Sequence, residues 1–441
     1  MSGRDADPLG GAVSDGILVV GGGIAGITAA LEAAEAGVQV YLVEKSAHLG
    51  GRVAQLARYF PKLCPPTCGL EINYRRLREN RDVHVFTTAE VEEIRGEPGH
   101  YEATIRRHPR YVNDRCTACG ACSAPCPVER PNPFDYGMST TKTISLGHEM
   151  AFPMKYSIDA STCLFDDCAK CVDACPYGAV DLHMEEERIQ LEVGAVVVAT
   201  GWQPYDAGAI ANLAFGHYPD VVTNVMLERM LAENGPTAGQ VLRPSDGTPV
   251  RSAAFVQCAG SRDRLHLGYC SSICCLASLK EASLLLERNP EATAHVFFID
   301  LRTPGTYEAF ATKVLAHPNV RTTKGKVADI LQDPDSGQLV VVADDMVAGA
   351  MRRLPVDLVV LASGMEPSLT QGRPAAEVAY DPDGFVAEGA DGGGIFAAGC
   401  ARAPVDVATA TLDATAAAMR AIRVLRQATP LPAPTVTVPV P

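Results

Sequence analysis

Short apolar runs alternate with a helical pattern at the start of the chain. Residues 16–20 read GILVV, residues 24–36 repeat small apolar side chains at helical spacing, and residues 38–43 read VQVYLV. Glycines separate the first run from the helical segment, and Gly37 ends that segment. This order predicts a strand–turn–helix–strand unit, which opens a parallel α/β sheet.

A second α/β unit is predicted from Ser252 onward, where the chain reads SAAFVQ. Between the two units, residues 188–200 return to strands that end in Ala199-Thr200-Gly201. The pattern then predicts a helix over 276–286, strands over 294–300, 339–342, 356–362 and 395–398, and a helix over 407–426.

The segment from Tyr111 to Leu182 differs in character, because it is dense in Cys and Pro and shows poor periodicity. We interpret it as a small inserted domain held together by metal sites. The resulting division is a flexible N-terminus (1–15), a first α/β domain in three parts (16–110, 183–250 and 346–427), the insertion (111–182), a second α/β domain (251–345) and a Pro-rich tail (428–441).

The glycine-rich turn after the first strand matches the pattern G-x-G-x-x-G. Gly21 permits a tight turn, Gly23 allows the backbone to approach a pyrophosphate, and Gly26 allows helix and strand to pack closely. The helix N-terminus stabilises phosphate charge, and Glu44, at the end of the next strand, can accept hydrogen bonds from a ribose. The combined context favours a dinucleotide site over a glycine turn without a ligand.

Three further segments favour FAD over NAD. Leu49-Gly50-Gly51-Arg52, Ala199-Thr200-Gly201 and the stretch ending in Gly399 resemble flavin-contacting segments of two-dinucleotide-fold flavoproteins. These proteins usually carry Asp after the last glycine, where this chain has Cys400, so the ribityl contact must come from another group. The candidate cofactor-binding residues are Gly21, Gly23, Ile24, Ala25, Gly26, Glu44, Lys45, Gly50, Gly51, Arg52, Ala199, Thr200, Gly201, Gly399 and Cys400.

Composition narrows the class of protein. The formal net charge is −14, which argues against nucleic acid and anionic lipid as direct partners. No apolar run is long enough to span a bilayer, and residues 1–15 do not resemble a secretory signal. We therefore expect a cytoplasmic protein without direct membrane insertion. Fifteen cysteines in a reducing compartment indicate metal ligands rather than a disulfide framework.

Two cysteine runs in the insertion match the ferredoxin pattern. Each run places three cysteines around one cubane, and its fourth cysteine, followed by Pro, reaches the other cluster. Structural zinc is the alternative, but zinc sites usually use two separated pairs. The predicted ligand sets are Cys116, Cys119, Cys122 and Cys175 for one [4Fe–4S] cluster, and Cys163, Cys168, Cys171 and Cys126 for the other.

A third group, Cys258-x11-Cys270-x3-Cys274-Cys275, is less regular. It lies where the second nucleotide fold would carry its own glycine loop, and the missing glycines indicate that a nicotinamide site is lost. From spacing alone, cluster ligands and buried core cysteines both remain open. The roles of Cys64, Cys68 and Cys400 also remain open, although we favour packed thiols for Cys64 and Cys68.

Over residues 16–426 the chain resembles the A subunit of the quinone-interacting membrane-bound oxidoreductase complex, a relative of the heterodisulfide reductase A subunit. The resemblance rests on VVGGGIAGITAALEAAEAGVQVYLVEKSAHLGGRVAQL, FPKLCPPTCGLEIN, CTACGACSAPCPVERPN, HEMAFPMKYSID and FVQCAGSRDRLHLGYCSSICCLASLK. It implies a Rossmann-like, thioredoxin-reductase-like α/β flavoprotein with an inserted ferredoxin-like domain. It also implies a third [4Fe–4S] cluster on Cys258, Cys270, Cys274 and Cys275.

The resemblance further implies an electron relay, with no catalytic acid or base, between a quinone-linked membrane partner and adenylylsulfate reductase. The implied partners are a related flavin and iron–sulfur protein, the B subunit, and a haem membrane protein, the C subunit, which would attach the chain peripherally to the inner membrane. Three alternatives are a flavin-bifurcating heterodisulfide-reductase-like subunit with soluble partners, a pyridine-nucleotide disulfide reductase using Cys64 and Cys68, and a zinc-bound scaffold.

Overall fold

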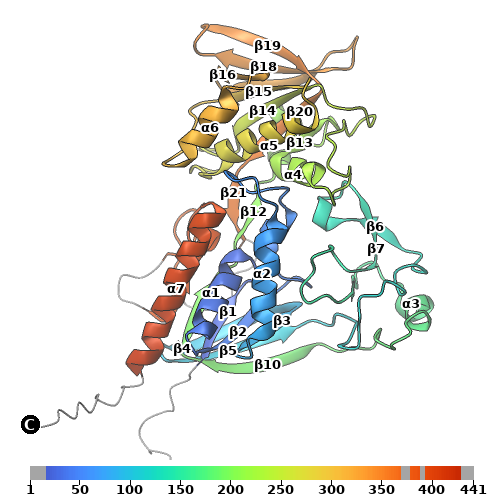
Figure 1. Ribbon diagram of the computed structural model, residues 1–441, viewed down its shortest axis with the longest axis vertical. Coiled ribbons are helices and arrows are strands. Elements are labelled where there is room, and N and C mark those ends of the chain that lie inside the picture. Colours follow the sequence, from blue (N-terminus) through green and yellow to red (C-terminus); the bar gives the residue numbers. More distant parts are fainter. Residues whose placement is uncertain (1–15, 369–377, 388–392, 429–441) are drawn as a thin grey trace, which may run out of the picture.

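Three bodies make up the protein in Figure 1, a computed structural model that describes residues 16–368, 378–387 and 393–428. Two α/β units lie one above the other, and the cysteine-rich insertion lies beside the lower unit. The predicted N-terminal segment 1–15 and, apart from Ala428, the predicted tail lie outside the described residues. No helix in the described ranges has the length and apolar character needed to cross a bilayer.

The lower unit is built on a five-stranded parallel sheet. Its strands, in spatial order, are β22 (Ile395–Ala397), β11 (Ala195–Val198), β1 (Gly16–Val20), β2 (Gln39–Glu44) and β3 (Val83–Thr87). One face is covered by α1 (Ile24–Glu35), α2 (Pro66–Glu79) and α7 (Val407–Ala428), and the other by an antiparallel sheet of β10 (Glu187–Val193), β5 (His100–Arg107) and β4 (Ala89–Glu97).

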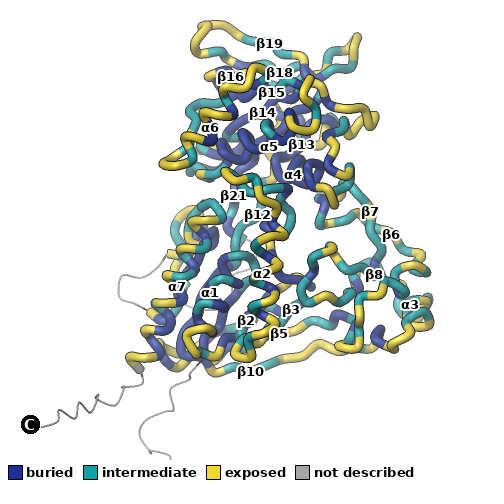
Figure 2. The backbone as a smooth tube through the Cα atoms, viewed as in Figure 1, coloured by how far each residue is buried: buried dark blue, intermediate teal, exposed yellow. Residues whose placement is uncertain are grey.

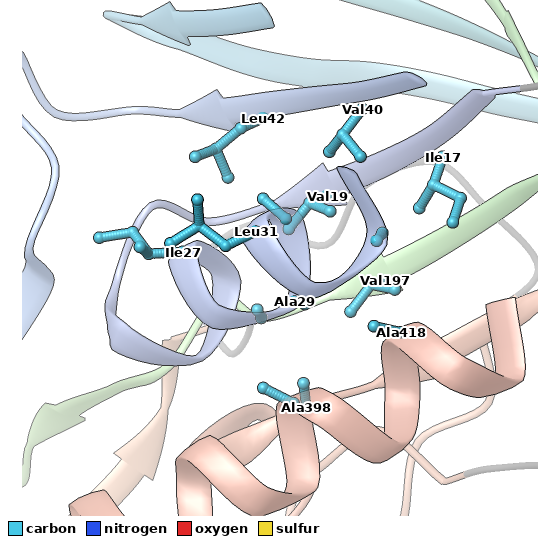
Figure 3. Packing of buried hydrophobic residues seen from close by; sticks show 14 of the residues in the cluster. Ile17, Val19, Ile27, Ala29, Leu31, Val40, Leu42, Val197, Ala398 and Ala418 are labelled. Atoms are coloured by element: carbon cyan, nitrogen blue, oxygen red, sulfur yellow. The ribbon is translucent and has the colours of Figure 1, made fainter. Parts of the chain in front are cut away.

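The central strand β1 is buried on both faces, which explains why its sequence is apolar without alternation. Ile17 and Val19 point toward the helices, where small side chains of α1 and α7, such as Ala29 and Ala418, allow the two helices to approach each other (Figure 3). Leu18, on the other face, packs against the antiparallel sheet. Figure 2 shows this continuous buried layer running through β1 and α1.

The upper unit contains a second five-stranded parallel sheet. Its order is β13 (Val221–Thr223), β20 (Leu358–Ser363), β14 (Ser252–Ala259), β15 (Thr293–Phe298) and β16 (Val320–Lys324). The helices α4 (Asn224–Leu231), α5 (Cys274–Arg288) and α6 (Tyr307–Leu315) share a core with one face, and the antiparallel strands β17 (Val327–Gln332), β18 (Leu339–Asp345) and β19 (Ala350–Val356) share a core with the other.

The chain crosses between the two units at a two-stranded ribbon of β12 (Trp202–Pro204) and β21 (Met365–Pro367). The upper unit therefore runs from one ribbon strand to the other and includes β13, α4 and β20. The sequence-based boundaries at 250/251 and 345/346 differ from this division, because they left β13, α4 and β20 in the first α/β domain. Short strands paired with distant partners carry no local signal of the sheet to which they belong.

The insertion leaves the lower unit between β5 and β10, and a bridge between Val112 and Val180 closes its base. Its regular structure is sparse and consists of the ribbons β6 (Glu129–Pro131) with β7 (Thr140–Lys142) and β8 (Ile144–Ser145) with β9 (Ser157–Ile158), and of α3 (Lys170–Asp173). Single 3-10 turns are η1 (Gly51–Gln55), η2 (Pro133–Asp135), η3 (Phe165–Asp167), η4 (Ala207–Ala209), η5 (Ala211–Leu213) and η7 (Gly399–Ala401).

Candidate functional site

The glycine turn joins β1 to α1 and leaves an open surface at the start of the helix. A Cβ on Gly26 would lie 1.8 Å from the carbonyl oxygen of Gly21, so only glycine allows this close packing. A Cβ on Gly23, the residue that precedes α1, would meet its nearest atom only at 4.0 Å, the Cα of Gly51. Ile24 and Ala25 begin the helix. The free space at Gly23 faces the positive end of α1, where a phosphate is stabilised.

Glu44 ends β2 beside this turn, with 9% of its surface exposed. One carboxylate oxygen accepts a hydrogen bond from the Gly22 amide at 2.6 Å, and the other accepts from the Ser46 amide at 2.7 Å. Each oxygen keeps a second acceptor position, so Glu44 can bind a ribose hydroxyl as well. Lys45 follows it on the exposed surface.

The second pair of glycines lies directly against the first turn. The Gly50 amide donates to the Gly22 carbonyl at 2.8 Å, and Gly51 begins η1. Arg52 continues from this turn and donates to the Trp202 carbonyl at 3.2 Å and to the Tyr136 hydroxyl at 2.9 Å. Arg52 therefore joins the glycine pair to the inter-unit ribbon and to the insertion, a contact that sequence reasoning did not find.

The segment after β11 carries a polar group that the protein leaves without a partner. The Thr200 hydroxyl is buried and has no hydrogen-bond partner within the described residues. Ala199 is buried before it, and Gly201 follows in a left-handed conformation with open space at its Cβ position. A buried hydroxyl that lacks a partner fits a polar ligand at this place, and the open cradle at Gly23 fits a dinucleotide.

Gly399 and Cys400 lie in η7, which precedes α7 in the chain. The Gly399 amide donates to the Asp413 carboxylate of α7 at 2.8 Å. Cys400 is buried, its thiol donates to the Val405 carbonyl at 3.4 Å, and burial raises the pKa of the thiol to about 11. The carboxylate that contacts this segment is therefore that of Asp413. Asp413 lies fourteen residues after Gly399, and the sequence pattern did not indicate it.

The insertion brings the cysteines of its two runs together across the sequence. One cavity is lined by Cys163, Cys168 and Cys171 together with Cys126 of the first run. A second cavity is lined by Cys116, Cys119 and Cys122 together with Cys175 of the second run. Apolar residues such as Ile144, Ile158 and Val180 pack around both groups, so the cysteines form much of the core of the insertion.

Backbone amides point at the first cysteine of each run. The Ala118 amide donates to Cys116 Sγ at 3.4 Å, and the Phe165 amide donates to Cys163 Sγ at 3.3 Å. The Ala179 amide likewise donates to Cys175 Sγ at 3.2 Å. Amide hydrogen bonds of this kind tune the sulfur ligands of iron–sulfur clusters. Burial, with the charge of Cys116, raises the pKa of the Cys122 thiol to about 12.

The third cysteine group gathers at the carboxyl edge of the upper sheet. Cys258 lies near the end of β14, in a left-handed conformation beside an irregularity in the β14–β20 pairing. Cys274 and Cys275 open α5; their thiols donate to carbonyls at the end of β20 and just after β15, those of Ser363 at 4.0 Å and Asp300 at 3.8 Å. In parallel sheets this edge is the usual ligand position.

Cys270 joins this group from the loop before α5. The Ser272 amide donates to Cys270 Sγ at 3.4 Å, which repeats the amide pattern of the insertion. Burial raises the pKa of the Cys258 thiol, and the negative charges of Cys275 and Cys270 raise it further. The same cause acts on Cys274, whose thiol is affected by the other three. The four cysteines therefore lie within electrostatic reach of one another.

Cys64 and Cys68 do not behave as packed thiols. Both are exposed, and Cys68 lies in the first turn of α2. The preference for packing was wrong, because Cys64 lies in the exposed part of the loop before α2 and the core-facing residues of α2 beyond its first turn are Leu70, Tyr74 and Leu77. In the described ranges no three His, Cys, Asp or Glu side chains are arranged to hold a single metal ion.

Known proteins resemble this chain in sequence over most of its length. Residues 16–92 match the family of FAD-dependent oxidoreductases. The chain is 37% identical, over 92% of its length and 64% of the relative, to the iron–sulfur A subunit of the CoB–CoM heterodisulfide reductase of Methanocaldococcus jannaschii. It is 35% identical to the A subunit of the H2:CoB–CoM heterodisulfide, ferredoxin reductase of Methanothermobacter marburgensis, over 93% of this chain and 64% of the relative.

Among solved structures, the thioredoxin reductases of T. acidophilum and Lactococcus lactis share the fold. Each superposes with a TM-score of 0.51; the identities are 14% and 13%, and the matches cover 93% and 94% of this chain and 98% and 99% of theirs. The predicted fold class is confirmed. The chain spans less than two thirds of the length of the curated relatives named above. It therefore carries an FAD-dependent oxidoreductase domain of thioredoxin-reductase-like fold and is homologous to the A subunits of heterodisulfide reductases.

Proposed function

We propose that this chain is an electron-relay subunit that holds FAD and three [4Fe–4S] clusters. When bound, the flavin exchanges electrons in pairs or singly and each cluster exchanges one. The protein supplies position, hydrogen bonds and burial. The observation that carries the proposal is the exchange of one cysteine between the two runs of the insertion, because Cys126 and Cys175 each line the other run's cavity.

The FAD would lie along the carboxyl edge of the lower sheet. Its pyrophosphate would meet the open surface at Gly23 and the N-terminus of α1, and its ribose would meet Glu44. The unpartnered Thr200 hydroxyl would donate to or accept from the flavin half. Cys400 cannot replace the carboxylate that would contact the ribityl chain, since its thiol is neutral and donates a hydrogen bond to the Val405 carbonyl.

Cluster ligation by three cysteine sets is favoured over zinc. The proposed sets are those of the two cavities together with Cys258, Cys270, Cys274 and Cys275. A cubane spreads four thiolates around a cage, whereas zinc draws its ligands toward one ion at about 2.3 Å. In the insertion each cysteine set lines a cavity, which supports a cluster at these two places.

The proposal extends to the partner proteins of this chain. We infer a related flavin and iron–sulfur B subunit, a haem-bearing C subunit that attaches the chain peripherally to the inner membrane, and adenylylsulfate reductase as the cytoplasmic partner in sulfur metabolism. The second candidate is a heterodisulfide-reductase-like subunit with soluble partners, favoured by relatives whose names refer to ferredoxin and H2. Purification of the native complex decides between them, since only the first contains a haem-bearing membrane protein.

Replacement of Cys274 by Ser tests the third cluster. The native protein should contain about twelve irons and C274S about eight, at four per cubane, while FAD content stays the same. Iron and sulfide analysis with electron paramagnetic resonance makes the measurement. C400S is the matched control, because Cys400 is buried but outside all three groups. Equal iron content in C274S and the native protein would remove the third cluster from the proposal.

A further inference from the structure

Three ionisable side chains are buried together between α4 and α5. Glu228 belongs to α4, and Lys280 and Glu281 belong to α5. The side chains of Glu228 and Lys280 are 3% and 2% exposed, and Glu281 is fully buried. Two carboxyl groups and one ammonium group therefore share an environment without access to solvent.

Glu228 has all the partners that a carboxylate needs. It forms an ion pair with Lys280, and its other oxygen accepts from the Ala57 amide at 2.9 Å. Lys280 donates in addition to the Arg58 carbonyl at 2.9 Å. By contrast, no group among the described residues donates a hydrogen bond to the Glu281 carboxyl, whose neighbour is the carboxyl group of Glu228.

Charge counting identifies which group holds a proton. With both carboxyls ionised, the three side chains carry a net charge of −1 in a buried site, which is costly. One bound proton makes the set neutral. Burial, and next the charge of Glu228, raise the pKa of Glu281 well above its ordinary range, while Lys280 acts in the opposite direction. Glu281 is therefore the protonated member, and its hydroxyl can donate to Glu228.

Glu281 also lies on the same face of α5 as a proposed cluster ligand. Cys274 precedes it by seven residues, two helical turns or about 10 Å along the axis. Between them on this face is Ser278, whose buried hydroxyl lacks a partner within the described part of the chain. Gln257 precedes Cys258 on β14 and alternates with Ala253 and Phe255, which pack against the helices; its amide is also buried without a partner there.

From this arrangement we propose that Glu281 is a redox-linked proton site for the centre held by Cys274, coupled to it electrostatically through the buried interior around Ser278 and Gln257. This inference rests on the proposed third cluster. At pH values above the pKa of Glu281 in the oxidised protein, one electron from a one-electron donor reduces the centre, and one proton from solvent binds to the Glu281 carboxylate, forming its O–H bond. No other bond changes.

The sign of the coupling follows from charge. An added electron near Cys274 favours the neutral form of Glu281 and raises its pKa. At pH values below the pKa of the oxidised state, Glu281 is protonated throughout and the midpoint potential is independent of pH. Above that pKa, reduction takes up a proton and the midpoint potential falls as the pH rises, until the pKa of the reduced state is passed.

Other charged groups near Glu281 are paired or lie elsewhere. Arg229 on α4 pairs with Asp135, and Arg58 pairs with the exposed Glu287. His295 on β15 stacks on Phe297, on the sheet face opposite α5. The titratable and charged groups on the packed elements are Glu228 and Arg229 (α4), Cys274, Cys275, Lys280, Glu287 and Arg288 (α5), Tyr307, Glu308 and Lys313 (α6), Cys258 (β14), His295 (β15) and Arg58 (the loop after η1).

The test is a redox titration of the third cluster at a series of pH values in the native protein, E281Q and E287Q. Gln mimics the neutral acid, so E281Q should hold the acid-side potential at every pH and lose the slope. E287Q removes an exposed carboxylate from the same helix and should keep the native slope. Infrared spectra should show a protonated-carboxyl band at neutral pH in the native protein that is missing from E281Q.

Each failure has a separate meaning. A third-cluster signal with the same pH slope in E281Q and native protein overturns the inference, while the proposed function stands. A missing third-cluster signal in the native protein overturns the third cluster and with it the coupling. If E281Q does not fold, the native infrared spectrum decides, because a protonated-carboxyl band that does not change between oxidised and reduced protein at any pH also overturns the proposal.

Discussion

Gly23 and Gly26 stand three residues apart in one turn, yet an added methyl group would meet different surroundings at each. At Gly26 it would lie 1.8 Å from a backbone oxygen, and at Gly23 it would meet nothing closer than 4.0 Å. Packing of the chain against itself therefore requires glycine at position 26. At position 23 the folded chain accepts a larger residue, and the space there is free for a ligand.

Substitution of the two glycines should separate folding from flavin binding. Gly23→Ala should fold normally but bind FAD at least about tenfold more weakly, about 1.4 kcal/mol, because the methyl group occupies the phosphate surface. Gly26→Ala should lower stability by about 1–3 kcal/mol, whether or not FAD is present. FAD titration of deflavinated protein and thermal unfolding measure the two effects. Equal FAD affinity in Gly23→Ala and the native protein would contradict this placement of the pyrophosphate.

The thiols outside the three cysteine groups should differ in reactivity. Cys64 and Cys68 are exposed, whereas Cys400 is buried with a pKa of about 11. A thiol with a raised pKa forms its reactive thiolate only at high pH, so Cys400 should resist alkylation at pH 8 and react as the pH approaches 11. Cys64 and Cys68 should be modified first. Mass spectrometry after timed alkylation locates the label; early modification of Cys400 would mean that η7 opens readily.

At the level of elements, sequence periodicity predicted the buried strands and the long helices well. β1, α1 and β14 carry apolar residues over most of their length, so their bounds agree with the prediction within about two residues. α2 was missed, since its sequence is polar and only Leu70, Tyr74 and Leu77 anchor it beyond its first turn. The three-residue strand β13 was missed because its pairing with β20 is set by tertiary contacts alone.

The candidate site shows the same difference between local sequence patterns and tertiary contacts. Glycines and cysteines at fixed spacing are local signals, so the sequence indicated each segment of the candidate site. The Asp413 carboxylate at Gly399 and the contact of Arg52 with Tyr136 join segments far apart in the chain, and spacing cannot reveal such contacts. The burial of Glu281 was also missed, because a single Glu in a helical pattern predicts a solvent-exposed position.

The exchange of Cys126 and Cys175 between runs leads to a crossed pattern of cluster loss. Cys126→Ser should disturb the cluster of Cys163, Cys168 and Cys171, although Cys126 belongs to the first run. Cys122→Ser should disturb the other cluster. Spectra of the two variants, compared with those of Cys119→Ser and Cys171→Ser, identify which signal is lost. If Cys126→Ser instead matches Cys119→Ser, each run binds its own cluster.

Over the whole molecule, α4 contacts all three bodies. Arg229 of α4 is 1% exposed and pairs at 2.8 Å with Asp135 of the insertion. Its guanidinium also donates to the Gln55 carbonyl of the lower unit at 3.4 Å and lies over the Phe134 ring at 4.5 Å. Glu228, the preceding residue, accepts from Ala57. Arg229 thus contributes one buried ionic contact that holds the insertion against both α/β units, beside the contact of Arg52 with Tyr136.

Removal of this cation should loosen the insertion as a body. Arg229→Ala leaves the Asp135 carboxylate buried without its partner, and breaking a buried pair in this way costs about 3–5 kcal/mol. The double variant with Asp135→Asn should recover part of that loss, because no uncompensated charge remains.

Arg75→Ala is the control, since Arg75 and Glu79 are 78% and 66% exposed and such pairs contribute about 0–1 kcal/mol. Thermal unfolding and limited proteolysis together make the measurement: Arg229→Ala should unfold earlier and release a fragment cut near residues 107–112 and 182–187. An Arg229→Ala protein as stable and as resistant as Arg75→Ala would mean that the cysteine core and the strands β5 and β10 hold the insertion in place without α4.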